Sequence, residues 1–110
     1  MTTMELTSKV CQPCEGGVDP MTPEEIGAKL DQVEEWEYTD GYLARSFSFN
    51  NYYQTISFVN AVAWVANREG HHPVLEVQFR SCTVKYWTHA IDGISENDFI
   101  CAAKINQLAP

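Results

Sequence analysis

The sequence predicts an α+β fold, a four-stranded antiparallel sheet with three helices on one face, in the order α-β-β-α-β-β-α. Three features lead to this prediction. Two helices carry complete start signals, four segments alternate apolar and polar residues in two pairs, and a long apolar helix separates the pairs. Strands joined as hairpins run antiparallel, and helices then cover the apolar face that such a sheet presents.

The first helix begins at residues 22–25. Thr22 is the expected N-cap, Pro23 takes the first helical position, and Glu25 completes a capping box with Thr22. One apolar stripe follows at spacings of four and three residues, made of Ile26, Leu30 and Val33. The pattern predicts a polar helix that buries a single face.

The first two strands are joined by Asp40-Gly41, a dipeptide typical of tight hairpin turns. Before the turn, Trp36-Glu37-Tyr38 alternates as a strand does. After the turn, one face of the second strand is made of Leu43, Arg45, Phe47 and Phe49. These residues predict a β-hairpin.

The second helix is expected over residues 51–69, with Asn50 as its cap and Gly70 as its C-terminal stop. Its apolar residues are Ile56, Phe58, Val59, Val62, Ala63, Trp64, Val65 and Ala66. One stripe is assigned to Val59, Val62, Ala63 and Ala66, with Phe58, Val65 and parts of Trp64 on other sides. A helix that is apolar nearly all round is buried on more than one side. We therefore expect this helix to face the sheet and also another subunit.

Two more strands and a helix complete the order. The apolar positions of the two strands alternate with polar ones and are Leu75, Val77 and Phe79, then Cys82, Val84 and Tyr86. Residues 95–98 form a second capping box. The apolar face of the last helix is made of Cys101, Ala102, Ile105 and Leu108.

Residues 1–20 lack sustained periodicity and are expected to form a flexible arm ahead of a single domain over residues 21–110. Fifteen acidic residues against seven basic ones give a net charge of −8, which disfavours direct binding to nucleic acid or to an anionic membrane. The longest apolar-rich stretch, residues 56–66, is much shorter than the about 20 residues of a membrane span. The chain start has no apolar signal-peptide region, so a cytoplasmic location is expected.

Four cysteines stand at Cys11, Cys14, Cys82 and Cys101. Cys11 and Cys14 have the CxxC spacing of redox sites and of half a zinc ribbon, but Glu15-Gly16-Gly17 follows where a redox motif would open a helix. A structural zinc site needs a second ligand pair, and Cys82 and Cys101 lie in a predicted strand and helix. Free thiols in the arm are the favoured interpretation, and metal or redox use stays open.

The histidines are His71, His72 and His89, and all three lie where predicted elements end. Such positions concentrate site residues. Pro73 biases His72 towards extended backbone, which turns the two adjacent imidazoles apart and disfavours a shared metal ion. Structural, acid–base and metal-binding roles all remain open from spacing alone. Asp98 has a sufficient structural role as the last residue of the second capping box.

These segments resemble the pterin-4a-carbinolamine dehydratase family. The resemblance rests on residues 69–73 (Glu-Gly-His-His-Pro), 84–89 (Val-Lys-Tyr-Trp-Thr-His) and 93–99 (Gly-Ile-Ser-Glu-Asn-Asp-Phe). The family pattern has His-His-Pro, a third histidine seventeen residues after the second, and an aspartate shortly beyond, as here. The resemblance runs from about Thr22 to Leu108 and leaves the CxxC arm outside. Many members carry an acidic residue four positions before the first histidine, where this chain has Asn67; Glu69 is out of that register.

The resemblance implies dehydration of 4a-hydroxytetrahydropterin to quinonoid dihydropterin, which recycles the cofactor of aromatic amino-acid hydroxylases. It implies no cofactor and no metal, because general acid and base steps suffice. Catalysis is assigned to His71, His72 and His89, with His72 and His89 as the acid–base pair and His71 orienting the substrate. The implied substrate-binding residues are His71, His72, Pro73, Thr88, His89, Ala90, Ile91 and Asp98.

The resemblance also implies partners. Family members form tetramers in which the long helices pack together, so a homotetramer through helix 51–69 is expected. Members also act as dimerisation partners of a homeodomain transcription factor, and relatives take part in enzyme assembly. The alternative function is therefore a protein-binding or regulatory module on the same fold. An aromatic amino-acid hydroxylase or a regulatory protein is the expected kind of protein partner.

Overall fold

A computed structural model describes residues 6–12 and 19–108, and in it four strands form one antiparallel sheet in the order β1-β2-β4-β3. The strands are β1 (Glu37–Thr39), β2 (Tyr42–Ser48), β3 (Val74–Val77) and β4 (Ser81–Tyr86). The helices are α2 (Pro23–Leu30), α3 (Tyr52–Glu69), α4 (Glu96–Asn106) and the 3-10 helix η1 (His89–Ile91). The predicted fold class and element order are confirmed.

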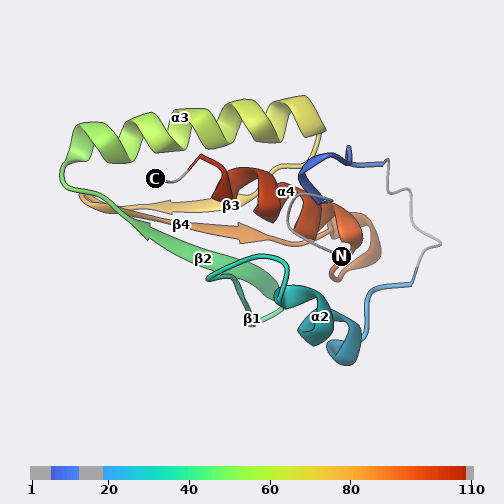
Figure 1. The fold of residues 1–110 in the computed structure, drawn as a ribbon. Coiled ribbons are helices and arrows are strands. Elements are labelled where there is room, and N and C mark those ends of the chain that lie inside the picture. Colours follow the sequence, from blue (N-terminus) through green and yellow to red (C-terminus); the bar gives the residue numbers. More distant parts are fainter. Residues whose placement is uncertain (1–5, 13–18, 109–110) are drawn as a thin grey trace.

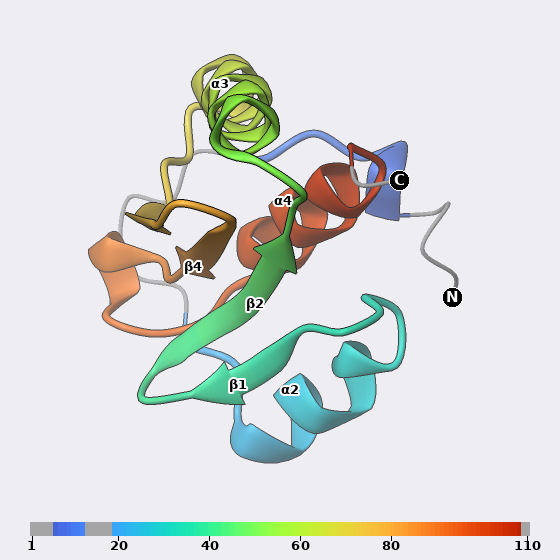
Figure 2. The same ribbon diagram turned by 90° about the vertical axis from the view of Figure 1, so that its left-hand side faces the viewer.

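The helices gather on one face of the twisted sheet (Figures 1 and 2). α3 contacts β3 and β4, α4 contacts β2, and α2 packs beside β1. Because these helices cover one side of the sheet, the residues of β4 alternate in burial: Cys82, Val84 and Tyr86 are buried against the helices.

None of the described helices has both the length and the apolar character needed to cross a membrane.

Local signals place the helix ends. The backbone N–H of Glu25 donates to Thr22 Oγ1 at 3.2 Å and that of Thr22 donates to Glu25 Oε1 at 2.8 Å, which confirms the first capping box. The second helix is capped by Asn51 rather than Asn50, because Asn51 has extended backbone and its Oδ1 accepts from Gln54 N at 2.8 Å. The left-handed Gly70, with φ of 67°, ends this helix as expected.

The two hairpins differ in how well their turns were predicted. Asp40 and Gly41 both have positive φ, 52° and 85°, as a tight turn between β1 and β2 requires. β3 ends at Val77, earlier than the alternation suggests, because Gln78 N donates to Ser81 O at 2.8 Å and closes a turn. Phe79, predicted as a strand residue, lies exposed in this turn.

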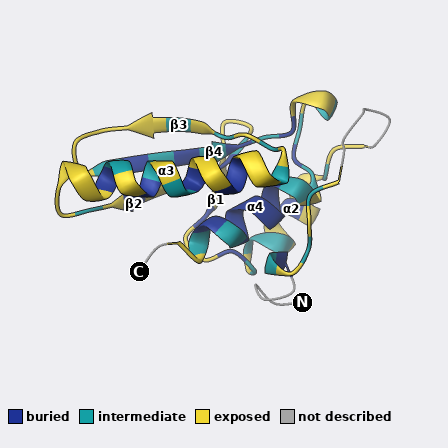
Figure 3. Cartoon of the chain, turned by 90° about the horizontal axis from the view of Figure 1, so that it is seen from above, coloured by how far each residue is buried: buried dark blue, intermediate teal, exposed yellow. Residues whose placement is uncertain are grey.

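α4 is buried along most of its length (Figure 3). It packs against both α3 and β2, so residues around most of its circumference meet apolar neighbours. Its buried apolar residues are Phe99, Ile100, Cys101, Ala102, Ala103 and Ile105. Leu108, expected on the apolar face, is exposed beyond the end of the helix. α4 is therefore the central packing element of the domain.

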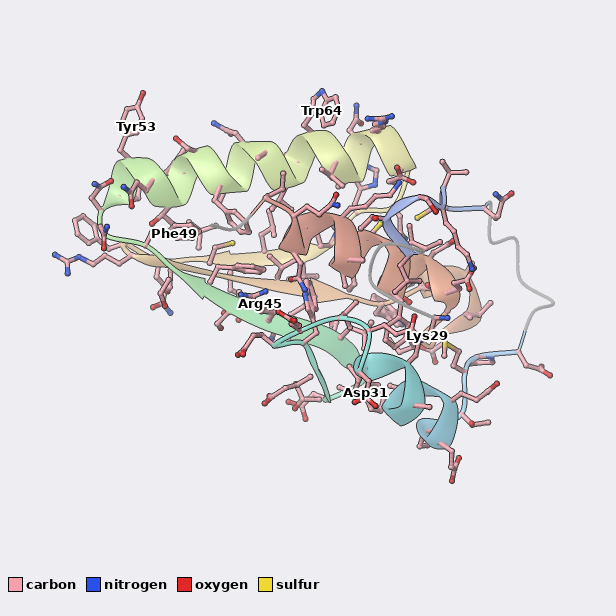
Figure 4. All side chains as sticks on the ribbon, in the orientation of Figure 1. Lys29, Asp31, Arg45, Phe49, Tyr53 and Trp64 are labelled. Carbon is pink, nitrogen blue, oxygen red and sulfur yellow. The ribbon has the colours of Figure 1, made fainter. Side chains whose placement is uncertain are left out.

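The apolar stripe of α3 differs from the one expected. Phe58, Val62 and Val65 are all buried, because spacings of four and three residues bring them onto one helix face. Assigning Phe58 and Val65 to other sides than Val62 was therefore wrong. The opposite side of α3 exposes Trp64, at 63% of its surface, and Tyr53 (Figure 4). The outward apolar area of α3 is thus smaller than the sequence suggested.

The described part of the N-terminal segment, residues 6–12, packs against the domain. Leu6 is fully buried in the core, and Lys9 Nζ lies 3.1 Å from Glu96 Oε2 of α4. These contacts differ from the expectation of a flexible arm, because a single apolar side chain with no periodic neighbours gives no sequence signal of packing. Cys14 lies outside the described residues.

Leu6→Ala is expected to lower the free energy of unfolding by about 2–5 kcal/mol, because it empties a buried leucine site. Val10→Ala is the matched control: Val10 is 61% exposed, and its loss should change stability by no more than about 0.5 kcal/mol. Urea denaturation of the full chain measures both. An unchanged midpoint in Leu6→Ala would mean that the segment is free in solution.

Candidate active site

Antiparallel pairing brings the histidine segments to one end of the sheet. Val74, at the start of β3, pairs with Lys85 near the end of β4. Residues 71–73, which lead into β3, therefore lie beside residues 87–89, which leave β4. The turn at Gly70 fixes the first of these segments, since His71 N donates to Ala66 O at 3.1 Å.

Asp98 is the buried centre of this region. Its side chain is 0% exposed, and its Oδ1 lies 2.6 Å from His71 Nε2. Its Oδ2 accepts from Thr88 Oγ1 at 2.7 Å and from Ser95 N at 2.9 Å. An ionised carboxylate only accepts hydrogen bonds, so Nε2 of His71 carries a proton and Nδ1 is the nitrogen left for other partners. The predicted capping role of Asp98 is thus present together with a contact to a histidine.

Two opposing effects act on the pKa of His71. Burial lowers the pKa of this imidazole, but the hydrogen bond and charge of Asp98 raise it, and the net direction is upward. The pair therefore adds stability that is fully present below the pKa of an unfolded histidine and is lost as pH rises through the higher folded pKa. A raised pKa also keeps more of the protonated imidazole at neutral pH.

Tyr86 contacts both the backbone and the ring of His71. Its Oη donates to the carbonyl oxygen of His71 at 3.1 Å, and the two rings lie 5.0 Å apart between centroids. Burial raises the pKa of Tyr86, so its hydroxyl stays protonated as a donor. His71 is therefore held at both its backbone and its side chain.

Two hollows open around His71 and His89. One, of about 410 Å³, is lined by Cys11, Gln12, Glu69, Gly70, His71, Thr88, His89, Ala90 and Asn97. The other, of about 280 Å³, is lined by Gly70, His71, His72, Val74, Lys85, Trp87 and His89. Gly70, His71 and His89 belong to both, so the hollows adjoin. The ring of His89 meets Trp87 edge-on at 5.0 Å.

The predicted site residues are distributed around these hollows. His71, Thr88, His89 and Ala90 line the larger one, and His72 borders the smaller one. Pro73 lies instead in a third hollow beside α3, with His72 and Trp64. Ile91 lines none of the hollows described here. Thr88 is buried, and its hydroxyl is directed to Asp98.

Besides Gly70, four residues that line the larger hollow were not among the predicted site residues. Glu69 was noted only as out of register. No sequence signal indicated that Cys11, Gln12 and Asn97 line a hollow, because their contacts join positions more than fifty residues apart.

Within residues 6–12 and 19–108, no three His, Cys, Asp or Glu side chains are grouped to hold a metal ion.

The fold and the candidate site together define a class of protein. It is an α+β domain in which a histidine, hydrogen-bonded to a buried carboxylate, lies beside an open hollow. A family model described as pterin 4 alpha carbinolamine dehydratase matches residues 19–108. A protein of Nitrosomonas europaea is 55% identical over 105 residues, 94% of this chain and 93% of its own. One of Legionella pneumophila (strain Corby) is 49% identical over 109 residues, 96% of each chain. Both are provisionally named pterin-4-alpha-carbinolamine dehydratase. The chain belongs to the pterin-4a-carbinolamine dehydratase family.

Solved structures agree on the fold. A Brucella melitensis protein described as a transcriptional coactivator/pterin dehydratase matches with a TM-score of 0.79 and 26% identity, over 84% of this chain and all of its own. A pterin dehydratase-like protein, described as a RuBisCO assembly factor in the alpha-carboxysome, matches with a TM-score of 0.56 and 23% identity, over 67% of this chain and 86% of its own. The second likeness shows the fold alone.

Asp98→Asn is expected to lower the pKa of His71, because the neutral amide removes the charge that offsets burial. NMR titration of the His71 ring measures this shift. Asp92→Asn is the matched control, an exposed aspartate in left-handed backbone that asparagine also adopts. Equal His71 pKa values in wild type and Asp98→Asn would contradict the assigned pair.

Proposed function

We propose that the protein dehydrates 4a-hydroxytetrahydropterin to quinonoid dihydropterin and water. The observation that carries the proposal is the His71–Asp98 pair, joined at 2.6 Å at the edge of hollows that His89 also lines. Family membership over residues 19–108 supports the substrate class. The product is the form from which the cofactor of aromatic amino-acid hydroxylases is regenerated, so the activity would serve such an enzyme, in the cytoplasm.

The reaction needs one acid and one base. The acid gives a proton to the C4a hydroxyl, the C4a–O bond breaks, and water leaves. The N5 electron pair forms the C4a=N5 double bond, and the base takes the N5 proton. One proton is given and one is taken, so no electrons are exchanged with the protein. Positioned imidazoles suit both steps at neutral pH.

The geometry supports His71 and His89 as this pair. Both histidines line both hollows, whereas His72 lines only the smaller of these two. His71, with its raised pKa, is suited to protonate the leaving hydroxyl through Nδ1 while Asp98 holds Nε2. His89 then accepts the N5 proton. This division differs from the pairing of His72 with His89 expected from the sequence, and His72 takes a substrate-binding role.

Binding of the flat pterin is assigned to the two segments that meet at this end of the sheet. His72 lines the smaller hollow on one segment, and Thr88 and Ala90 line the larger one on the other. Pro73 and Ile91 line neither of these hollows, and their assigned part in binding rests on the segments to which they belong. Asp98, fully buried, acts through His71 rather than by touching substrate. Thr88 in turn holds Asp98 through its hydroxyl. The backbone groups of both segments can meet the donor–acceptor edge of the ring.

His71→Ala and His89→Ala are each expected to lower kcat by roughly 10²-fold or more, the usual cost of a lost acid–base group. His72→Ala should chiefly raise KM. The assay follows dehydration of freshly generated 4a-hydroxytetrahydropterin, with Gln107→Ala as an exposed control at the C-cap of the helix that carries Asp98. Chelator treatment should leave the rate unchanged.

Three outcomes would alter the proposal. A large loss of kcat in His72→Ala with little loss in His71→Ala would restore the pairing expected from the sequence. Loss of activity with chelator that zinc restores would indicate a metal mechanism. A wild-type chain that is folded but has no turnover would favour the alternative of a protein-binding module.

We also propose a homotetramer assembled through α3. Trp64 is largely exposed on the side of α3 that faces away from the sheet (Figure 4), and the preceding residue, Ala63, is also exposed. An exposed tryptophan of this kind is typical of an interface. Val62 and Val65 are buried within the chain, so charges there would test folding instead of assembly.

Trp64→Glu is expected to break the assembly, because an interface would bury its carboxylate unpaired. Ala28→Glu, at an exposed position of α2, adds the same charge away from α3 and should leave the assembly intact. Light scattering at micromolar concentration measures the mass. A stable 12.5 kDa monomer for the native chain would refute the proposal.

A further inference from the structure

The thiols of Cys11 and Cys101 lie against each other. Their Sγ atoms are 3.5 Å apart, although ninety residues separate them in the sequence. Cys101 is fully buried in α4, whereas Cys11 is partly exposed and lines the larger hollow. The sulfur atoms would have to approach by about 1.5 Å to reach the about 2.05 Å of a disulfide bond. Cys82, buried in β4, has no comparable thiol contact among the described residues.

The backbone around Cys11 is held in place from two sides. Glu69 Oε1 accepts from Cys11 N at 2.9 Å, and Lys104 Nζ fixes the same carboxylate at 2.7 Å from Oε2. The side chain of Asn97 makes two hydrogen bonds with the backbone of Gln12. Its Oδ1 accepts from Gln12 N at 3.0 Å, and its Nδ2 donates to Gln12 O at 2.7 Å. This double contact keeps the Cys11 thiol next to its partner, which favours reaction between the two over reaction with other thiols.

The two thiols are chemically unequal. The contact with Cys101 and partial burial raise the pKa of Cys11. The hydrogen bond from Cys11 lowers the pKa of Cys101 against the effect of burial, with help from the Tyr86 hydroxyl and the nearby His71. Loss of the first proton from the pair is thereby favoured. Because the two Sγ atoms are 3.5 Å apart, the remaining proton can pass to Cys101, which leaves the accessible Cys11 as the thiolate that reacts with peroxide.

We propose that Cys11 and Cys101 form a dithiol site that hydrogen peroxide or a related hydroperoxide oxidises reversibly to a disulfide. Peroxide reaches Cys11 from the hollow and oxidises its thiol to a sulfenic acid, releasing one water as the O–O bond breaks. Cys101 then attacks that sulfur, the S–O bond breaks, and a second water leaves. Two thiols lose two electrons in all, and the peroxide accepts them.

The disulfide would tie residues 11 and 12 to α4 one turn after Asp98. Cys11 and Gln12 are a wall of the hollow that His71 and His89 also line, so oxidation would fasten that wall covalently. The proposal rests on the thiol geometry and holds whether or not the chain dehydrates pterins.

The experiment treats the reduced full-length chain with hydrogen peroxide and counts free thiols before and after. Two of the four thiols should be lost and should return with dithiothreitol. Tryptic digestion without reduction should join the peptide of residues 10–29 to that of residues 86–104. Both Cys11 and Cys14 lie in the first peptide, so the cross-link must persist in Cys14→Ser and vanish in Cys11→Ser and Cys101→Ala.

Two further variants complete the test. Cys82→Ser is the control and should leave the cross-link unchanged. Asn97→Ala should slow its formation several-fold, because it releases Gln12 while keeping the Asn97 carbonyl oxygen that lies 3.6 Å from Cys11 Sγ. A Cys11–Cys14 disulfide, over-oxidation of Cys11 without a cross-link, or four unreacted thiols would each overturn the proposal. Cys11→Ser keeps the test decisive if Cys101→Ala fails to fold.

Discussion

The buried carboxylate of Asp98 is the interaction on which the candidate site depends. An unpaired charge in a protein interior costs several kcal/mol, so the fold must bring donors to it. They come from three parts of the chain, His71 after α3, Thr88 after β4, and Ser95 at the start of α4. The same hydrogen bonds that compensate the charge therefore join these elements and orient an imidazole towards the hollow.

This arrangement separates rigid from accessible groups. His71 is fixed by Asp98 and by the hydroxyl of Tyr86, whereas His89 stands exposed at the start of η1. An acid–base pair benefits from both properties, because one group needs a defined orientation and pKa while the other must reach substrate and solvent. The extensive burial of α4 supplies the rigidity, since Asp98 lies in its first turn.

The N-terminal segment extends the family domain. The family model begins at residue 19, yet Leu6 belongs to the core and Cys11 and Gln12 line the larger hollow. Glu69, which is out of register for the acidic position common in the family, instead holds this segment through Cys11 N. One carboxylate thereby links the segment to the end of α3 and, through Lys104, to α4.

The sequence by itself determined the elements, because capping boxes, the Asp40-Gly41 turn and alternation along β4 act between near neighbours. It also singled out the three histidines as candidates, because their spacing matches the family pattern. Helix spacing places Val62 and Val65 on one face, but only the tertiary structure decided that this face is buried against the rest of the domain and that Cys11 meets Cys101. Such contacts depend on how whole helices pack and carry no local pattern. The partner of His71 was decided in the same way, by the distance between Asp98 and the end of α3.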